Sequence, residues 1–117
     1  MAGIRLIAQL HVAPGAAREF VDGWRDHLAE VSEEPGCLQY EMFQSTTDLE
    51  QIALLEHWAS KEAFETHWAL ELGRPGGPGV PAVDHLLVEW NGQMFHTEIY
   101  DRKRHMFADG EWSIAEE

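Results

Sequence analysis

The sequence predicts an α+β fold in which helices cover one face of a single antiparallel sheet. Three observations lead to this prediction. Residues 4–12 alternate apolar and polar side chains as a strand does, and residues 17–31 repeat apolar side chains at helical spacing. The segments that follow complete the order β-α-β-β-α-(α)-β, which is the split-βαβ, ferredoxin-like arrangement.

The first strand and the first helix have the clearest patterns. In the strand, Ile7 lies on the face opposite a row of apolar residues, so we expect a central strand with both faces partly apolar. That row is Ile4, Leu6, Ala8 and Leu10. The helix opens at "APG", with Pro14 in its first turn, and ends at "EEPG". Its apolar stripe is Ala17, Phe20, Val21, Trp24, Leu28 and Val31.

Two strands and a second helix come next. The strands, residues 37–43 and 51–58, are separated by a polar loop rich in Ser, Thr and Asp. Ser60 is placed to cap the helix, and Glu62 in its first turn favours the helix dipole. The helix runs into "GRPGGPG", residues 73–79, which neither a helix nor a strand would accommodate.

The remainder of the chain contains a third helical stripe, a last strand and a tail. The stripe is Val83, Leu86, Leu87 and Trp90. Residues 93–100 form the expected last strand, and Asp109-Gly110 indicates a hairpin in the tail. We expect a single domain, in which residues 1–101 form the ferredoxin-like fold and residues 102–117 are a C-terminal extension.

Composition restricts the partners and the compartment. The chain has 117 residues, of which 44% are hydrophobic and 25% are charged, as in soluble globular proteins. A formal net charge of −13 argues against nucleic acid and membranes as partners, because both are bound through Lys and Arg clusters. Cys37 is the single cysteine, and the N-terminus lacks the basic start of a signal peptide. We therefore expect a cytoplasmic protein.

Apolar residues on both faces of the predicted strands indicate an assembly. Helices can cover only one face of a four-stranded sheet, so the other face would expose apolar side chains unless a second subunit covered it. We therefore predict a homodimer formed face to face through the sheet. By strand alternation His57 lies on the face opposite Trp58, and we expect it to line the dimer face.

Part of the sequence carries a family likeness. "EPGCLQYE", Glu34–Glu41, lies on the second strand and is followed by E-x-W at Glu56 and Trp58. A helix with His67 nine positions after the tryptophan completes the pattern. Over residues 4–68 the chain thus resembles the antibiotic biosynthesis monooxygenase (ABM) family, whose members are small dimeric α+β barrels.

This resemblance implies a chemistry and a site. The family includes quinol and polyketide oxygenases, so the resemblance implies oxidation of a phenolic or anthrone-type substrate by O₂. Such a substrate, once deprotonated, reduces O₂ itself in a dry pocket. His67 is the candidate base, since a neutral imidazole accepts a proton at physiological pH. We expect a small hydrophobic aromatic substrate, no cofactor and no metal. The expected substrate-binding residues are Trp58, Phe64, Trp68, Tyr40, Trp24 and Leu54.

Other functions remain open. An isomerase or cyclase on the same scaffold would use His67 as an acid–base group without O₂, and a non-catalytic module would only hold an apolar ligand. His67 would also fit as a buried histidine bonded to a backbone carbonyl. Residues 73–79 replace helix found in relatives, which predicts an altered pocket mouth. Haem-degrading relatives use an Asn on the first strand, and none occurs between Ile4 and Val12.

Two further groups of titratable residues come from different predicted strands. His11, His57 and His96 would form a metal site if they converged, but no two of them share an element at ligand spacing. Glu41 and Glu56 would form either a carboxylate pair or ordinary salt bridges and hydrogen bonds at a sheet edge.

Overall fold

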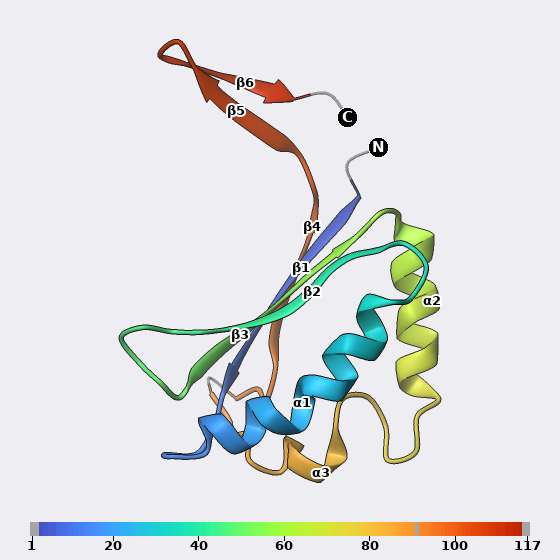
Figure 1. The fold of residues 1–117 in the computed structure, drawn as a ribbon, viewed down its shortest axis with the longest axis vertical. Helices are drawn as coiled ribbons and strands as arrows, with labels where there is room; N and C mark the ends of the chain where they lie inside the picture. Colours follow the sequence, from blue (N-terminus) through green and yellow to red (C-terminus); the bar gives the residue numbers. More distant parts are fainter. Residues whose placement is uncertain (1–2, 91, 116–117) are drawn as a thin grey trace.

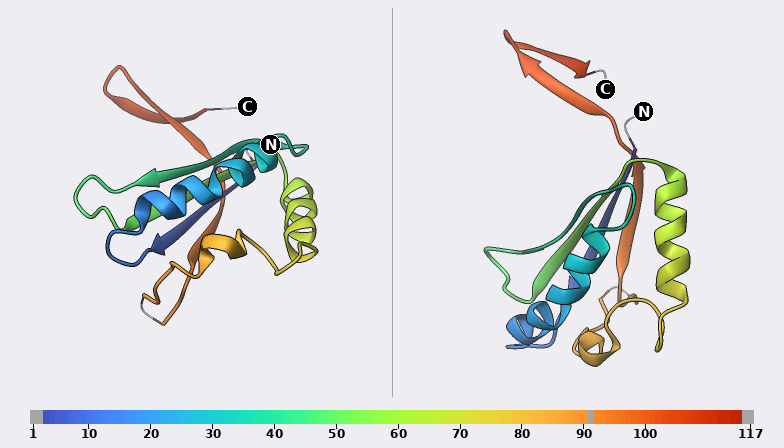
Figure 2. Two further views of the ribbon diagram at one scale, coloured as in Figure 1. Left: turned by 60° about the horizontal axis from the view of Figure 1, so that its bottom comes forward. Right: turned by 45° about the vertical axis from the view of Figure 1, so that its right-hand side comes forward.

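A four-stranded antiparallel sheet forms the centre of this computed structural model, which describes residues 3–90 and 92–115 (Figure 1). Its strand order is β2-β3-β1-β4. The strands are β1 (Ile4–His11), β2 (Cys37–Gln44), β3 (Gln51–Trp58) and β4 (His96–Asp101). Helices α1 (Ala17–Ser32) and α2 (Lys61–Leu72) lie on one face of the sheet, and the short α3 (Pro81–Asp84) packs beside α1 (Figure 2). The predicted ferredoxin-like α+β fold is therefore confirmed.

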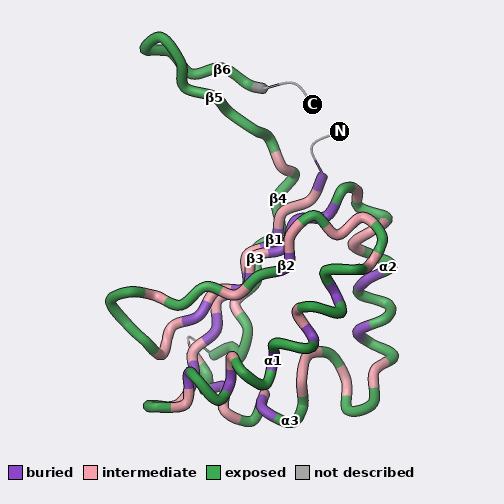
Figure 3. Tube along the Cα trace, viewed as in Figure 1, coloured by how far each residue is buried: buried purple, intermediate pink, exposed green. Residues whose placement is uncertain are grey.

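The register of the sheet decides which side chains lie beneath the helices. On β1, Leu6 lies opposite Glu56 of β3 and Ile99 of β4, and Ala8 lies opposite Leu54. These five residues share the helix-covered face. The largest fully buried side chains belong to β1, β3, α1 and the residue after β1, and are Trp58, Phe20, Leu10, Ile52, Val12 and Val31. Each removes apolar area worth about 1.5–3 kcal/mol from water. Figure 3 marks the buried positions along the chain in purple.

Helix α1 follows the predicted stripe with two differences. Pro14 lies in the turn before the helix and not in its first turn, because the helix begins only at Ala17. The buried face includes His27 in addition to Phe20, Trp24 and Val31. A histidine is thus packed among the core residues of α1, one turn from Trp24.

Helix α2 begins as predicted, at a Ser60 cap whose hydroxyl accepts a hydrogen bond from the Ala63 N–H at 3.1 Å. Its buried residues are His67 and Glu71, which are one turn apart, whereas Trp68 is 45% exposed. A helix normally buries an apolar stripe against its sheet. Polar contacts therefore hold α2 in place to an unusual degree.

The predicted third helix is wrong beyond its first turn. The segment after α3 leaves the helical path and pairs with the end of β1: Val88 N–H donates to the His11 carbonyl at 2.8 Å, and Ala13 N–H donates to the Leu86 carbonyl at 2.9 Å. Leu87 forms a bridge with Val12. Backbone pairing with β1 thus overrides the helical spacing of the apolar residues. The last strand accordingly starts at His96, later than predicted.

The tail forms the predicted hairpin, of β5 (Arg104–Ala108) and β6 (Glu111–Ala115). Positive φ angles of 53° at Asp109 and 76° at Gly110 suit a tight two-residue turn. The hairpin extends away from the sheet and helices (Figures 1 and 2), and every described side chain in it is exposed. Its assignment to the same domain as residues 1–101 stays a prediction.

The face of the sheet without helices is more polar than predicted. Ile7, Ala53 and Leu55 lie near its centre and are only partly buried. Around them, Arg5 donates a hydrogen bond to Gln39. His57 lies on this face as predicted, opposite Arg5, but it is only 8% exposed. Within the described residues, no helix is long and apolar enough to cross a membrane.

The turn from α1 into β2 depends on Gly36 and offers a test of the packing between this turn and α2. Gly36 has a φ of +80°, and an added Cβ would lie 2.6 Å from the Ala63 Cβ. Gly15 has a nearly identical φ of +79° but no neighbour within 4 Å. We expect Gly36→Ala to lower the free energy of unfolding by about 1–3 kcal/mol more than Gly15→Ala, measured by urea denaturation. Equal losses would contradict the close approach of this turn to α2.

Candidate functional site

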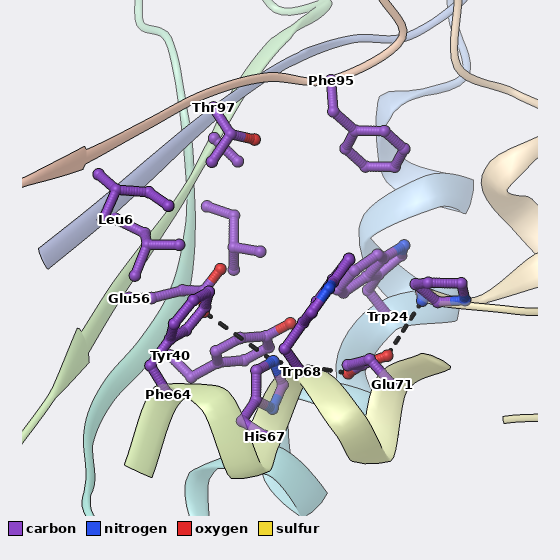
Figure 4. A pocket seen from close by; sticks show the side chains of 15 residues that line it. Leu6, Trp24, Tyr40, Glu56, Phe64, His67, Trp68, Glu71, Phe95 and Thr97 are labelled. Atoms are coloured by element: carbon purple, nitrogen blue, oxygen red, sulfur yellow. Dashed lines mark hydrogen bonds and ion pairs between the residues drawn. The ribbon is translucent and has the colours of Figure 1, made fainter. Parts of the chain in front are cut away.

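A cavity of about 490 Å³ lies between the sheet, α1, α2 and the end of the Gly/Pro-rich loop (Figure 4). This volume is in the range of small-molecule sites. The sheet contributes mainly apolar side chains, which are Leu6, Ala8, Leu54 and Ile99. Aromatic side chains form much of the remaining wall and are Trp24, Tyr40, Phe64, Trp68 and Phe95. Two carboxyl groups, Glu56 and Glu71, and the imidazole of His67 also line the cavity.

His67 is held on three sides. Its ring stacks on Trp58 at a centroid distance of 4.6 Å and meets the Tyr40 ring edge at 5.5 Å. Its Nδ1 lies 2.9 Å from Oε1 of Glu34, in the turn that ends α1. The side chain is 3% exposed. The hydrogen-bond partner of His67 is thus a carboxylate and not the backbone carbonyl considered from the sequence.

The second ring nitrogen of His67 is on the cavity side (Figure 4). Nε2 lies 3.8 Å from Oε1 of Glu71 and 4.0 Å from Oε1 of Glu56. Both distances exceed hydrogen-bond length. Nε2 therefore has two carboxylates nearby and a direct bond to neither.

Glu71 connects the two helices to the Gly/Pro-rich loop. Its Oε1 lies 2.8 Å from Nε2 of His27, although the direction between them does not suit a hydrogen bond. Its Oε2 accepts a hydrogen bond from the Gly79 N–H at 3.1 Å and lies 3.4 Å from Nε of Arg74. Burial acts to raise the pKa of Glu71, but the His27 and Gly79 contacts outweigh it and the pKa is lowered. Glu71 is therefore ionised at neutral pH.

For Glu56, the effect of burial on the pKa outweighs that of its hydrogen bond. Burial raises the pKa of its carboxyl group, and the hydrogen bond from Trp58 Nε1 at 3.0 Å only partly opposes this. Glu56 is 7% exposed. Burial and the nearby Glu56 charge also raise the pKa of Tyr40, so Tyr40 remains a neutral phenol. The cavity thus contains one firmly ionised carboxylate and one that retains its proton more readily.

The structure places six of the seven site residues predicted from the sequence on the cavity wall. They are His67, Trp24, Tyr40, Leu54, Phe64 and Trp68. The seventh, Trp58, is fully buried behind the His67 ring, so it supports the imidazole and does not line the cavity. Substrate contact by these residues stays a prediction.

Sequence reasoning missed the acidic partners of His67 and the part played by His27. Two spacings could have revealed them: Glu71 follows His67 by one helical turn, and His27 follows Trp24 by three residues on the buried face of α1. Glu34 lies in the turn "EEPG", and no local spacing links it to His67. Only the fold brings these two side chains together.

The other sequence-based site hypotheses do not agree with the structure. His11 and His96 both contact the Trp90 ring. His11 pairs with Gln51 at the start of β3, whereas His57 lies near the end of that strand, opposite Arg5. No group of three or more His, Cys, Asp or Glu side chains suited to a metal occurs among the described residues. Glu41 pairs with Leu55 in the ladder and Glu56 with Tyr40, so the two carboxylates lie on opposite faces and form no pair.

Cys37 is also chemically inactive in this position. It is partly buried at the start of β2. Burial and the negative charge of Glu34 raise the pKa of its thiol to about 11. At neutral pH the side chain is therefore a thiol and not a nucleophilic thiolate.

Several solved structures share the fold. A conserved protein from Methanosarcina mazei Go1 aligns with a TM-score of 0.71 and 23% identity, covering 88% of this chain and 95% of that one. The Pseudomonas aeruginosa protein PA3566 aligns with a TM-score of 0.64 and 25% identity, covering 87% and 95%. A mutant of SnoaB, a cofactor-independent oxygenase from Streptomyces nogalater, aligns with a TM-score of 0.68 and 16% identity, covering 89% and 96%.

Sequence comparison identifies the family of the chain, whereas the structural similarities show only its fold. No curated protein has a significantly similar sequence. The sequence profile of the antibiotic biosynthesis monooxygenase family, however, matches residues 3–71, which is more than half of the chain and includes His67, Glu34, Glu56 and Glu71. The protein therefore belongs to the antibiotic biosynthesis monooxygenase (ABM) family.

Proposed function

We propose that this protein is a cofactor-independent monooxygenase that oxidises a flat, hydroxylated aromatic compound with O₂, such as an aromatic polyketide or a quinol. For an anthrone-type substrate the reaction converts a ring CH₂ to C=O. One oxygen atom enters the product and the other leaves as water, and the substrate itself supplies all four electrons. The protein needs only to remove a proton and to exclude bulk water.

The contact between Glu34 and His67 is the observation that carries this proposal. A carboxylate accepts hydrogen bonds only, so in the neutral imidazole the proton lies on Nδ1 and is donated to Glu34. Nε2 then has a lone pair available on the cavity side. After it accepts a proton from the substrate, the imidazolium is stabilised by the carboxylates of Glu34 and Glu71.

The walls of the cavity support the second requirement. Apolar and aromatic side chains from β1, β3, α1 and α2 surround His67. The cavity volume of about 490 Å³ suits a fused-ring compound. In such surroundings a deprotonated substrate is poorly solvated, so transfer of an electron to O₂ becomes easier.

Oxygen uptake tests the proposal. Wild-type protein should consume O₂ with 1,8-dihydroxyanthrone, measured with an oxygen electrode, and His67→Ala should lower the rate by about 10²–10⁴-fold, the usual contribution of a general base. His85→Ala is the control, because His85 is exposed and follows α3 away from the cavity wall. A rate for His67→Ala within a few-fold of the wild-type rate would show that His67 is not the catalytic base. Tryptophan quenching by the anthrone with no oxygen uptake would favour a binding module.

A second candidate function is an isomerase or cyclase on the same site. It is favoured by Glu56, whose Oε1 lies 4.0 Å from Nε2 of His67 and whose pKa is raised by burial. An acid and a base this close can move a proton between two substrate atoms without O₂. Turnover of a substrate under strictly anaerobic conditions would identify this function.

The protonation of Glu56 gives a pH-dependent prediction. Because its folded pKa lies above the ordinary value of 4.5, the stability it contributes is present below pH 4.5 and is lost as pH rises through the folded pKa. Glu56→Gln does not titrate. The melting temperature of Glu56→Gln relative to wild type should therefore increase between pH 4.5 and pH 8, measured by circular dichroism. A difference that is constant or falls with pH would show that burial does not penalise this carboxylate.

We also infer that two copies pair through the helix-free face of the sheet. Ile7 and Leu55 are partly buried at its centre, and Phe43 and Tyr100 are each 47% exposed around them. The C-terminal hairpin supports an assembly, because an isolated two-stranded hairpin is marginally stable in water. It exposes four large apolar side chains, which are Met106, Phe107, Trp112 and Ile114.

Light scattering tests this assembly. At micromolar concentration the particle should have twice the 13.3 kDa mass of the chain. Leu55→Arg should give monomers because it places a charge at the centre of the interface. Leu70→Arg should remain dimeric, since Leu70 is 54% exposed on α2, which covers the other face of the sheet. A monomeric wild type, or a dimeric Leu55→Arg, would exclude this interface.

A further inference from the structure

We propose that the ligand of the cavity beside His67 is a flat aromatic compound that carries a positively charged amine. The inference rests on the proposed function only in that it concerns the same cavity. It names a class of ligand from the charges and rings that line the cavity and does not depend on the reaction.

The charges around the cavity leave a negative excess when His67 is the neutral base. Three carboxylates, Glu34, Glu56 and Glu71, lie within 4.0 Å of its ring nitrogens. His27 approaches Glu71 at 2.8 Å, and Arg74 lies 3.4 Å from Glu71 and 3.2 Å from Glu30. Even if Glu56 keeps its proton and His27 carries a charge, the carboxylates of Glu30, Glu34 and Glu71 share only two cations, His27 and Arg74, which leaves one negative charge. The described cavity wall includes no Lys or Arg.

Glu71 is the place where a cation would be received. It lines the cavity and is 3% exposed. Its Oε1 has no directed hydrogen bond, although His27 Nε2 is close. A buried carboxylate oxygen without a directed donor is costly, and an ammonium group supplies up to three donors. The structure thus contains a buried acceptor at the edge of an open cavity.

Aromatic rings surround this end of the cavity. Trp24 from α1 and Trp68 from α2 lie near Glu71 in Figure 4, and Tyr40 and Phe64 lie on the other side of His67. The faces of such rings attract ammonium groups and also stack on flat ligands. The same walls therefore serve both parts of the proposed ligand, the amine near Glu71 and the ring system over His67.

A cationic ligand also removes a difficulty in the proposed reaction. Proton transfer to His67 leaves the substrate negatively charged near the carboxylate of Glu71. The imidazolium of His67 offsets this charge in part, and an amine on the substrate would offset it further, whereas an acidic group on the substrate would add to it. Ligands that carry a carboxylate or a sulfate should be excluded for the same reason.

Three anthracenes of similar shape test the inference by isothermal titration calorimetry at pH 7.5 under argon. They are 9-(aminomethyl)anthracene, 9-anthracenemethanol and anthracene-9-carboxylate, which are cationic, neutral and anionic. We expect the amine to bind the full-length protein at least tenfold more tightly than the alcohol, and the carboxylate to bind most weakly. An alcohol or carboxylate that binds as tightly as the amine would overturn the inference.

Glutamine variants test whether Glu71 causes the preference for the amine. Glu71→Gln should lower the affinity for the amine at least fivefold more than the affinity for the alcohol, whereas Glu65→Gln on the exposed side of α2 should change neither. If Glu71→Gln does not fold without its Gly79 contact, Glu34→Gln serves the same purpose, because it removes a carboxylate 2.9 Å from the His67 ring. A full preference for the amine in every folded cavity variant would contradict the charge-based argument.

The result is separable from the proposed oxygenase activity. Binding is measured without O₂, so a failure of oxygen uptake leaves the amine preference as support for this inference. Oxygen uptake with the neutral anthrone combined with no preference for the amine would overturn this inference and leave the oxygenase proposal standing.

Discussion

The contact between Glu34 and His67 is the interaction on which the site depends. It joins the turn after α1 to the middle of α2 across 33 positions of sequence, at 2.9 Å. Because Nδ1 is engaged, the ring cannot rotate to turn Nε2 away from the cavity without losing a charge-assisted hydrogen bond. Stacking on Trp58 restricts the ring further. One buried contact thus fixes the orientation, the tautomer and the chemistry available to the imidazole.

The same contact explains why α2 can pack with so little apolar surface. Its buried residues are His67 and Glu71, and each has partners from a different part of the chain. Glu71 reaches α1 through His27 and the Gly/Pro-rich loop through the Gly79 N–H. The cavity lies beside these two residues, and Phe64 and Trp68 of the same helix also line it. Structure and function are therefore coupled, since the groups that hold the helix also line the site.

The sequence was sufficient to predict the fold because local signals agreed with one another. The strand alternation from Ile4, the Ser60 cap and the turn at Asp109-Gly110 each depend on neighbouring residues only, and each is confirmed. The segment from residue 83 to 90 was misread because its helical spacing competes with backbone pairing to β1, which is a long-range effect.

The site could be predicted only in part, for a related reason. His67 and the aromatic walls follow from helical and strand periodicity and from the family resemblance. The partners of His67 depend on contacts between distant segments, and a glutamate in a polar turn such as Glu34 resembles any solvated residue in sequence. The sequence-based interpretation placed Glu56 at a sheet edge, where a salt bridge is the ordinary expectation. In the structure Glu56 is buried on an inner strand, beneath the helices.

The most direct test of this account is the tautomer of His67, measured by ¹⁵N NMR of the imidazole nitrogens at pH 8. The His67 signals are identified as those absent from the spectrum of His67→Ala. For the neutral form of the ring we predict a proton on Nδ1, bonded to Glu34, and an unprotonated Nε2 facing the cavity. A neutral ring that instead carries its proton on Nε2 would leave the cavity without a base at this position and would contradict the account.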